Sequence, residues 1–313
     1  MRPSVVQKSL DRILDTVMND HNGNVADYIP ELAKVDPDRF GIAVATVDGH
    51  VYASGDADDP FTIQSISKPF VYGMALDDRG PEDVLRRVGV EPSGDAFNSI
   101  VMDEVRNRPL NPMVNAGAIA CAALVRGDDL ADRRQRVLET FSRYAGRELT
   151  IDEDVCESER RTGHRNRAIA FLELNSGMID EPVDEHLDLY FAQCSILVTA
   201  RDLALMAATL ANGGRNPVTG EQAIAPEHVS RVLTVMATCG MYDWSGEWMF
   251  RIGLPAKSGV GGGIIAVSPG KFGIAVVSPP LDDAGNSVRA QRAITEISNA
   301  LGGNPYARAK AGS

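Results

Sequence analysis

The pattern of side chains near the start of the chain predicts a helix, then a β-hairpin, then a second helix. In residues 4–20 apolar side chains recur every three or four positions, which predicts an amphipathic helix. Residues 41–53 are predicted to form a β-hairpin, because Asp48-Gly49 suits a tight turn that needs positive φ. A further helix follows this hairpin and is expected to end near residues 77–80.

The middle of the chain is predicted to be mostly helical. Several of its helices carry start or stop signals, since Pro81, Pro112 and Pro226 lie near first turns and Gly213-Gly214 follows a last turn. The predicted helices cover residues 81–88, 112–125, 130–144, 151–161, 165–174, 183–197, 200–212 and 226–238.

A strand pattern returns towards the end of the chain. Residues 248–252, 263–268 and 271–278 are predicted to form three strands, the last two joined by Pro269-Gly270. Residues 287–301 then predict a final helix.

The order of these elements predicts an α+β fold. An antiparallel sheet built from both ends of the chain would be flanked by the N- and C-terminal helices, with an all-helical region inserted. Residues 1–80 together with 245–313 would form the sheet part, and residues 81–244 the inserted helical part. We expect one functional site at the seam between the two parts.

Composition and charge narrow the class of protein. Of the 313 residues, 44% are hydrophobic and 24% are charged, as in an ordinary globular protein. The net charge of −12 argues against nucleic acid or an anionic membrane as a partner, because both need a basic face. The N-terminus shows no secretory pattern, and no stretch approaches the ~18 apolar residues of a membrane span. These observations favour a cytoplasmic protein.

Cysteine and histidine are dispersed along the chain. The five histidines form no H-x-x-x-H pair, so no metal site is expected. No glycine-rich phosphate-binding motif is present, so no nucleotide cofactor is expected either. The cysteines form no C-x-x-C pair and are expected to be buried free thiols: Cys121, Cys156, Cys194 and Cys239.

One short motif suggests catalytic chemistry. Ser65-Ile66-Ser67-Lys68 has the form S-x-x-K and falls where a helix is expected to start, so the serine and the lysine share a face. A serine hydroxyl needs a base at neutral pH, and a lysine whose pKa is lowered by burial can be that base. The form alone is weak, because Ser268-Pro269-Gly270-Lys271 matches it and is predicted to be a turn between strands.

A second motif, Lys257-Ser258-Gly259, precedes the run Gly261-Gly262-Gly263 and is predicted to enter the second of the late strands. K-[ST]-G on an edge strand facing an S-x-x-K helix is the arrangement of serine β-lactamases and penicillin-binding proteins. The backbone N–H groups of Ser65 and Val260 could then hold the oxyanion of a tetrahedral intermediate. The alternative is a glycine-rich turn with a surface lysine. The S-x-N and Y-x-N motifs are absent, which argues against penicillin chemistry.

Taken together, these motifs and several further blocks resemble the serine-dependent glutaminases, which share the β-lactamase fold. The resemblance covers roughly residues 10–303, and its blocks follow the family's order. One of them, residues 111–119, is very similar to the family's N-P-x-x-N-A-G-A motif. The others are residues 64–68, 157–161 with 166–168, 190–195, 238–243 and 255–263.

The resemblance implies roles for particular residues. Ser65 would be the nucleophile and Lys68 the base that activates it. Tyr190 and Tyr242 would line the pocket as phenols near the serine hydroxyl, with catalytic roles that stay open. The implied substrate contacts are Ser65, Asn115, Glu159, Asn166, Tyr190, Tyr242 and the backbone of Val260.

Some of these residues also suit glutamine by their chemistry alone. Glu159 is the natural partner for the α-ammonium, and Asn115 and Asn166 can donate to and accept from the carboxylate or amide. Plainer interpretations exist as well. Asn115 could cap its own helix, and Glu159 could lie on a solvated helix face. Asn166 and Tyr190 could be ordinary turn and core residues.

The predicted function is a glutaminase that hydrolyses the side-chain amide of L-glutamine to L-glutamate and ammonia through a glutamyl-serine intermediate, with no cofactor. Two alternatives remain open: a penicillin-recognising acyl-serine hydrolase or β-lactamase, and a non-catalytic glutamine-binding relative. The resemblance also implies a homo-oligomer, either a dimer or a tetramer. Helical faces such as residues 204–208 carry apolar surface that could be buried in it.

Overall fold

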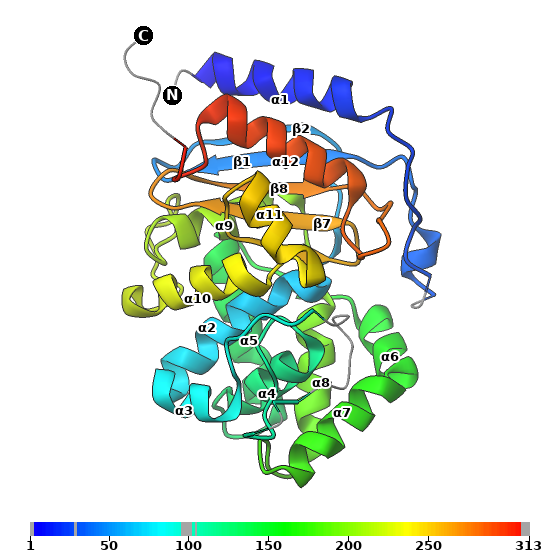
Figure 1. Ribbon diagram of the computed structural model, residues 1–313, viewed down its shortest axis with the longest axis vertical. Coiled ribbons are helices and arrows are strands. Elements are labelled where there is room, and N and C mark those ends of the chain that lie inside the picture. Colours follow the sequence, from blue (N-terminus) through cyan, green and yellow to red (C-terminus); the bar gives the residue numbers. More distant parts are fainter. Residues whose placement is uncertain (1–2, 28–29, 95–101, 104, 308–313) are drawn as a thin grey trace.

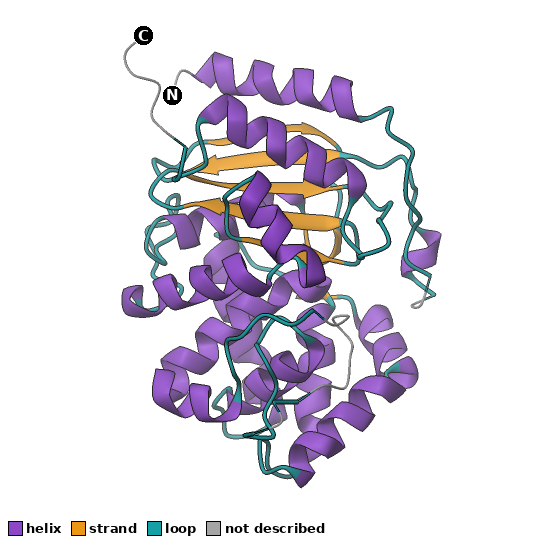
Figure 2. Cartoon of the chain, in the orientation of Figure 1, coloured by secondary structure: helices purple, strands orange, loops and turns teal. Residues whose placement is uncertain are grey.

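The computed structural model describes residues 3–27, 30–94, 102–103 and 105–307. A five-stranded antiparallel sheet with helices on both faces packs against a region made mostly of helices (Figures 1 and 2). Its strands follow the order β2 (Val51–Gly55), β1 (Gly41–Thr46), β8 (Phe272–Val277), β7 (Gly263–Ser268) and β6 (Ala256–Gly259).

Strands from the two ends of the chain pair at the centre of this sheet. In the pairing of β1 with β8, Gly41 lies opposite Val277 and Thr46 lies opposite Phe272, which confirms the predicted sheet. β1 and β2 form the predicted hairpin, and Gly49 in its turn has a φ of 89°. A glycine adopts such a positive φ without steric cost.

Alternate side chains of β1 pack into different layers, as the period of two in a strand requires. Ile42 and Val44 belong to the core beside α1 (Pro3–Val17) and α12 (Val288–Leu301), which cover one face of the sheet (Figure 1). The intervening alanines of β1 belong to the larger core on the other face.

α9 (Ala200–Ala211) covers that other face and lies very close to the sheet. A Cβ atom on Gly273 of β8 would lie 2.3 Å from the backbone nitrogen of Ala208, so only glycine permits this approach. The apolar residues 204–208 are thus buried against the chain's own sheet. The expectation that this face could serve an oligomer contact is therefore wrong.

The helices of the other region supply most of the remaining core. The small sheet β3–β5–β4 joins them. Residues 196–197, predicted as the end of a helix, instead belong to the strand at 196–198, which pairs with β3 on one side and β4 on the other. None of the described helices is long and apolar enough to cross a membrane. The elements are α2 (Lys68–Arg79), α3 (Pro81–Arg87), α4 (Asn115–Leu124), α5 (Leu130–Ala145), α6 (Glu153–Thr162), α7 (His164–Asn175), α8 (Val183–Cys194), α10 (Pro226–Cys239), β3 (Phe61–Thr62), β4 (Thr150–Ile151) and β5 (Ile196–Val198).

The predicted strand at residues 248–252 is wrong, because most of this segment is the helix α11 (Ser245–Arg251). Trp248 and Ile252, four positions apart, are buried, whereas Phe250 between them is 90% exposed. This is helical spacing, which the three consecutive apolar residues 248–250 concealed. The third late strand is β6, so the K-S-G motif forms a strand of its own and does not enter β7.

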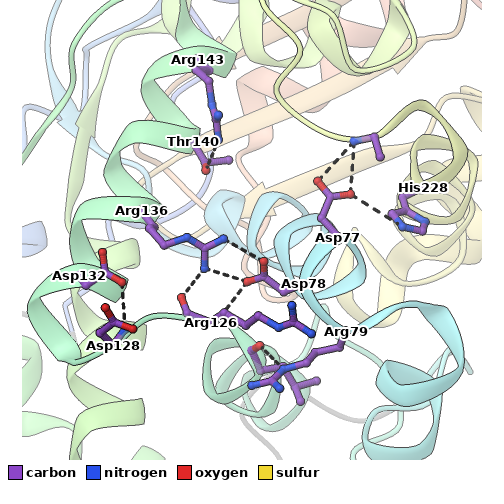
Figure 3. A network of polar contacts seen from close by, with 12 residues as sticks. Asp77, Asp78, Arg79, Arg126, Asp128, Asp132, Arg136, Thr140, Arg143 and His228 are labelled. Carbon is purple, nitrogen blue, oxygen red and sulfur yellow. Dashed lines mark hydrogen bonds and ion pairs between the residues drawn. The ribbon is translucent and has the colours of Figure 1, made fainter.

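The C-terminal end of α2 is fixed by a network of polar contacts (Figure 3). Asp78 accepts hydrogen bonds of 2.9 and 3.0 Å from the guanidinium of Arg136 in α5, and one of 2.8 Å from the backbone of Arg126. The neighbouring Asp77 accepts from the backbone of Ala225 and lies 3.8 Å from His228 at the start of α10. These contacts connect α2, which begins at Lys68, to two neighbouring helices.

The division of the chain into a sheet part and an inserted helical part stays a prediction. α9 belongs by sequence to residues 81–244 but packs on the sheet.

Candidate active site

Ser65 and Lys68 lie at a junction between two kinds of helix. Ser65 belongs to the 3₁₀ turn η2 (Gln64–Ser67), and Lys68 is the first residue of α2. In a 3₁₀ turn, side chains three positions apart lie almost directly above one another, so the S-x-x-K spacing brings the serine and the lysine to one side. Gln64, just before the serine, has a φ of 51°, a left-handed conformation that non-glycine residues adopt mainly where the surrounding structure holds them.

Lys68 is buried and has no carboxylate within ion-pair distance in the described part of the chain. Its Nζ donates a 2.7 Å hydrogen bond to Oδ1 of Asn115, the first residue of α4. Burial lowers the pKa of Lys68 to about 8, although the negative charge of Glu159 acts in the opposite direction. Much more of this amine is therefore unprotonated near neutral pH than in an exposed lysine, as a general base requires.

Asn115 links this lysine to a third helix. Its Nδ2 donates a 3.0 Å hydrogen bond to Oδ1 of Asn166 in α7. The side chain of Asn115 does not cap its own helix, because α4 has its N-cap at Val114. Lys68, Asn115 and Asn166 thus form one hydrogen-bonded chain across α2, α4 and α7.

Glu159 of α6 is buried, so it does not lie on a solvated helix face. Burial raises the pKa of its carboxyl to about 7, against a hydrogen bond from the Gln64 side chain and the charge of Lys68, which both lower it. The Gln64 amide also donates to Oγ1 of Thr62 at 3.1 Å. A buried carboxylate of this kind is prepared to receive a cationic group from a ligand.

Tyr242 lies far from Ser65 in the sequence and comes from a different element. It begins the 3₁₀ turn η3 (Tyr242–Trp244) and has a φ of 57°, which is again left-handed. Its hydroxyl donates to the backbone oxygen of Ser258 at 3.1 Å. Burial raises the pKa of this phenol well above its ordinary value, while hydrogen bonds to Ser65 and Ser258 lower it.

Tyr190 comes from α8 and is buried beside the same group of residues. It hydrogen-bonds the thiol of Cys194, whose pKa burial raises to about 12. Cys194 in turn lies 3.9 Å from the hydroxyl of Ser67. The structure therefore places Tyr190 near the S-x-x-K turn through Cys194 and Ser67.

Val260 directly follows the edge strand β6. This edge is partly covered, because the N–H of Ser258 donates to the backbone oxygen of Gly240 at 3.1 Å. Among the described residues, neither the N–H of Val260 nor that of Ser65 has a hydrogen-bond partner. A Cβ atom on Gly259 would lie 3.0 Å from the side chain of Ile66, so this glycine lets the strand pack against η2. These two donors, one on the serine itself and one after the strand that packs against η2, could receive an oxyanion.

Gln64 was missed as a functional candidate in the sequence, whereas Lys257 was marked by its motif without a role of its own. Gln64 orients Glu159, and its only signal was its place next to Ser65 in the S-x-x-K block. Lys257 of the K-S-G motif is fully buried, so the interpretation as a surface lysine is wrong. Its Nζ lies 4.3 Å from the ring centre of Tyr242.

Comparisons with known proteins agree on one family. The family model for glutaminase matches residues 23–306. A glutaminase of Nostoc sp. (strain PCC 7120) is 56% identical over 302 residues, which are 96% of this chain and 90% of the relative. A glutaminase of Microcystis aeruginosa (strain NIES-843) is 56% identical over 293 residues, 94% of this chain and 87% of the relative. The crystal structure of Mglu in its glutamate form has a TM-score of 0.93 and 42% identity, and the match covers 100% of this chain and 72% of that one.

Proposed function

Because this chain belongs to the glutaminase family, we propose that the site around Ser65 is where it hydrolyses its substrate. The protein is an amidohydrolase that converts L-glutamine to L-glutamate and ammonia, and it has the β-lactamase-like α+β fold of its structural neighbours. The residues assigned to each step below are our proposal.

Glutamine binds by its two charged ends and its amide. Glu159 receives the α-ammonium, because it is a buried carboxylate without a cationic partner of its own in the described chain. Asn115 and Asn166 bind the carboxylate or amide edges through the donors and acceptors that their mutual hydrogen bond leaves. The glutamate form of the related Mglu supports a pocket for this amino-acid skeleton.

The reaction proceeds through an ester. Oγ of Ser65 attacks the amide carbon, and its proton passes to Lys68, either directly or through Tyr242 or Tyr190. The amide oxygen becomes an oxyanion held by the N–H groups of Ser65 and Val260, each worth about 3 kcal/mol in the transition state. The C–N bond then breaks as the proton returns to the nitrogen, so ammonia leaves and a glutamyl-serine ester remains.

Water completes the cycle. It attacks the ester carbon and gives its proton to the same base, and the ester C–O bond breaks to release glutamate and restore the Ser65 hydroxyl. One observation carries this proposal. Lys68, three positions after the serine, is buried, and its amine is held by a hydrogen bond to Asn115.

The test is ammonia release from L-glutamine by the purified protein, with Ser65→Ala measured beside it. We expect Ser65→Ala to lose at least about 10⁴-fold in kcat while remaining folded. A glutamyl mass increment on Ser65 during turnover would support the ester directly. A normal turnover number in Ser65→Ala would overturn it. A chromogenic β-lactam tests the penicillin-recognising alternative, and we expect no hydrolysis.

We also propose that the protein forms a homo-oligomer. The exposed pair Phe171 and Leu172 on α7, 52% and 46% exposed, supports such a contact better than the buried α9 face. Light scattering of Phe171→Glu against wild type tests this, and an unchanged mass would exclude this pair as the contact. The cytoplasmic location stays a prediction.

A further inference from the structure

Lys257 is a lysine whose burial needs an explanation. Its side chain has no exposed surface, and in the described residues no carboxylate lies within ion-pair distance of it. A buried ammonium without a counter-charge is costly, so such a lysine is retained only where its contacts compensate for the burial. Because the side chain has no exposed surface, we also do not expect it to touch the substrate.

The contacts of Lys257 converge on Tyr242. Its Nζ lies 4.3 Å from the ring centre of Tyr242, and the same Nζ donates to the backbone oxygen of Ser258 at 2.5 Å. The Tyr242 hydroxyl donates to that same oxygen at 3.1 Å. The lysine therefore lies on the face of the ring and shares an acceptor with its hydroxyl.

Tyr242 needs such support because its backbone is left-handed, with a φ of 57°. The hydroxyl of Ser245 fixes the backbone of this turn, donating to the Tyr242 oxygen at 2.8 Å and accepting from Met241 at 3.0 Å. Those bonds hold the main chain but not the direction of the ring. Ser258 contacts its hydroxyl and Lys257 contacts its face.

We propose that Lys257 is a positioning residue for glutamine hydrolysis, which holds the phenol of Tyr242 in the orientation that reaches Ser65. The inference rests on the proposed role of Tyr242 in moving the proton between Ser65 and Lys68. Lys257 acts through the tyrosine and contacts neither the substrate nor the serine. Burial and the nearby charge of Lys68 both lower the pKa of Lys257. The positioning role depends on the contacts of Lys257 with Ser258 and Tyr242 and not on a proton that it gains or loses.

The experiment is a double-mutant cycle on Lys257→Met and Tyr242→Phe in the full chain. Methionine keeps the length and apolar stem of the side chain, so the core stays filled, and circular dichroism and the unfolding midpoint report folding. We expect Lys257→Met to lower kcat about 100-fold and to leave KM within about threefold, because a proton-transfer group is disturbed and not substrate binding. In the Tyr242→Phe background the same change should cost less than about threefold. Lys271→Met, which changes an exposed lysine in the turn between β7 and β8, is the matched control.

The outcomes distinguish the proposed role of Tyr242 in proton transfer from the positioning role of Lys257. Full activity of Tyr242→Phe would overturn the proposed role of the tyrosine, and with it this inference. An impaired Tyr242→Phe, with Lys257→Met either fully active or additive to it, would overturn the role of Lys257 alone. A rise in KM without a fall in kcat would also contradict the positioning role. If Lys257→Met does not fold, Lys257→Gln gives the same comparison with a donor for Ser258 retained, and we expect an intermediate kcat.

Discussion

The Nζ of Lys68 and the Oδ1 of Asn115 are joined by a 2.7 Å hydrogen bond, so the candidate base is held by the first residue of another helix. A neutral amide partner leaves the lysine free to lose its proton, whereas a carboxylate partner would keep the amine charged. An asparagine at position 115 therefore helps to keep the pKa of Lys68 low.

Asn115→Asp tests this relationship. A negative charge against Lys68 should raise its pKa by about one to two units. Since the base acts only when unprotonated, the rise of kcat/KM with pH, expected near pH 8 in the wild type, should move to higher pH by the same amount. The position of this limb is measured, because Asn115 also contacts substrate in our proposal and the absolute rate will change. An unshifted limb would contradict the role of Lys68 as the base.

Glu159→Gln should weaken recognition of the α-ammonium. We expect KM for glutamine to rise about 10- to 100-fold, because a buried charge-assisted contact is lost. The measurement compares glutamine with 4-carbamoylbutanoate, which lacks the amino group. The wild type should prefer glutamine strongly, and the variant should lose most of that preference. Glu157→Gln, on the same helix but paired with Arg160 at the surface, is the control and should behave as wild type.

The buried Glu173 predicts a pH-dependent stability that is separate from catalysis. Neither oxygen of its carboxyl has a hydrogen-bond partner within the described residues, and burial raises its pKa well above the ordinary 4.5. With the pKa raised in the folded state, the contribution of Glu173 to stability is fully present below pH 4.5. It is lost as the pH rises and the unfolded chain ionises, by up to about 1.4 kcal/mol per pH unit.

Glu173→Gln should flatten this fall, which urea unfolding at several pH values between 4 and 8 would measure. The slope with pH is the test, since glutamine also buries an amide at this position. Glu148→Gln, at an exposed position on the loop after α5, should leave the slope unchanged. Parallel curves for wild type and Glu173→Gln would show that this carboxyl is ionised in the folded protein.

Asp78→Asn should destabilise the fold without touching the chemistry. It removes a two-bonded ion pair with Arg136 that connects α2 to α5 (Figure 3), at a cost of about 1–3 kcal/mol in the free energy of unfolding. The control, Asp83→Asn, breaks an exposed ion pair with Arg86 and should cost less than about 1 kcal/mol. Equal unfolding midpoints for the two variants would show that the Asp78 contacts contribute little.

Much of the fold could be predicted from local pattern. The hairpin follows from Asp48-Gly49, and the sheet shared by both chain ends follows from the order of strands and helices. The failure at residues 248–252 has a plain cause. Five apolar or long side chains in a row fit the period of a helix and the period of a strand equally well. Only the packing of Trp248 in the core beside the sheet decides between the two.

The candidate site was predictable in its residues but not in its contacts. Short motifs marked Ser65, Lys68 and Lys257, because S-x-x-K and K-S-G place these residues at fixed, short spacings that can be recognised in the sequence. The bond between Lys68 and Asn115, and the approach of Lys257 to Tyr242, join positions far apart in the chain. Such pairings depend on tertiary packing, which no local spacing encodes.

The central pairing of β1 with β8 also governs when the protein can work during its own synthesis. Ser65 leaves the ribosome early, but Tyr242, Val260 and the strand that completes the sheet are made in the last quarter of the chain. Until residues 272–277 emerge, one edge of β1 has no partner, and β7 and β6, the strand that precedes Val260, cannot join the sheet through β8. We therefore expect a nascent chain that already carries Ser65, our proposed nucleophile, to be inactive, and hydrolysis to begin only when translation is nearly finished.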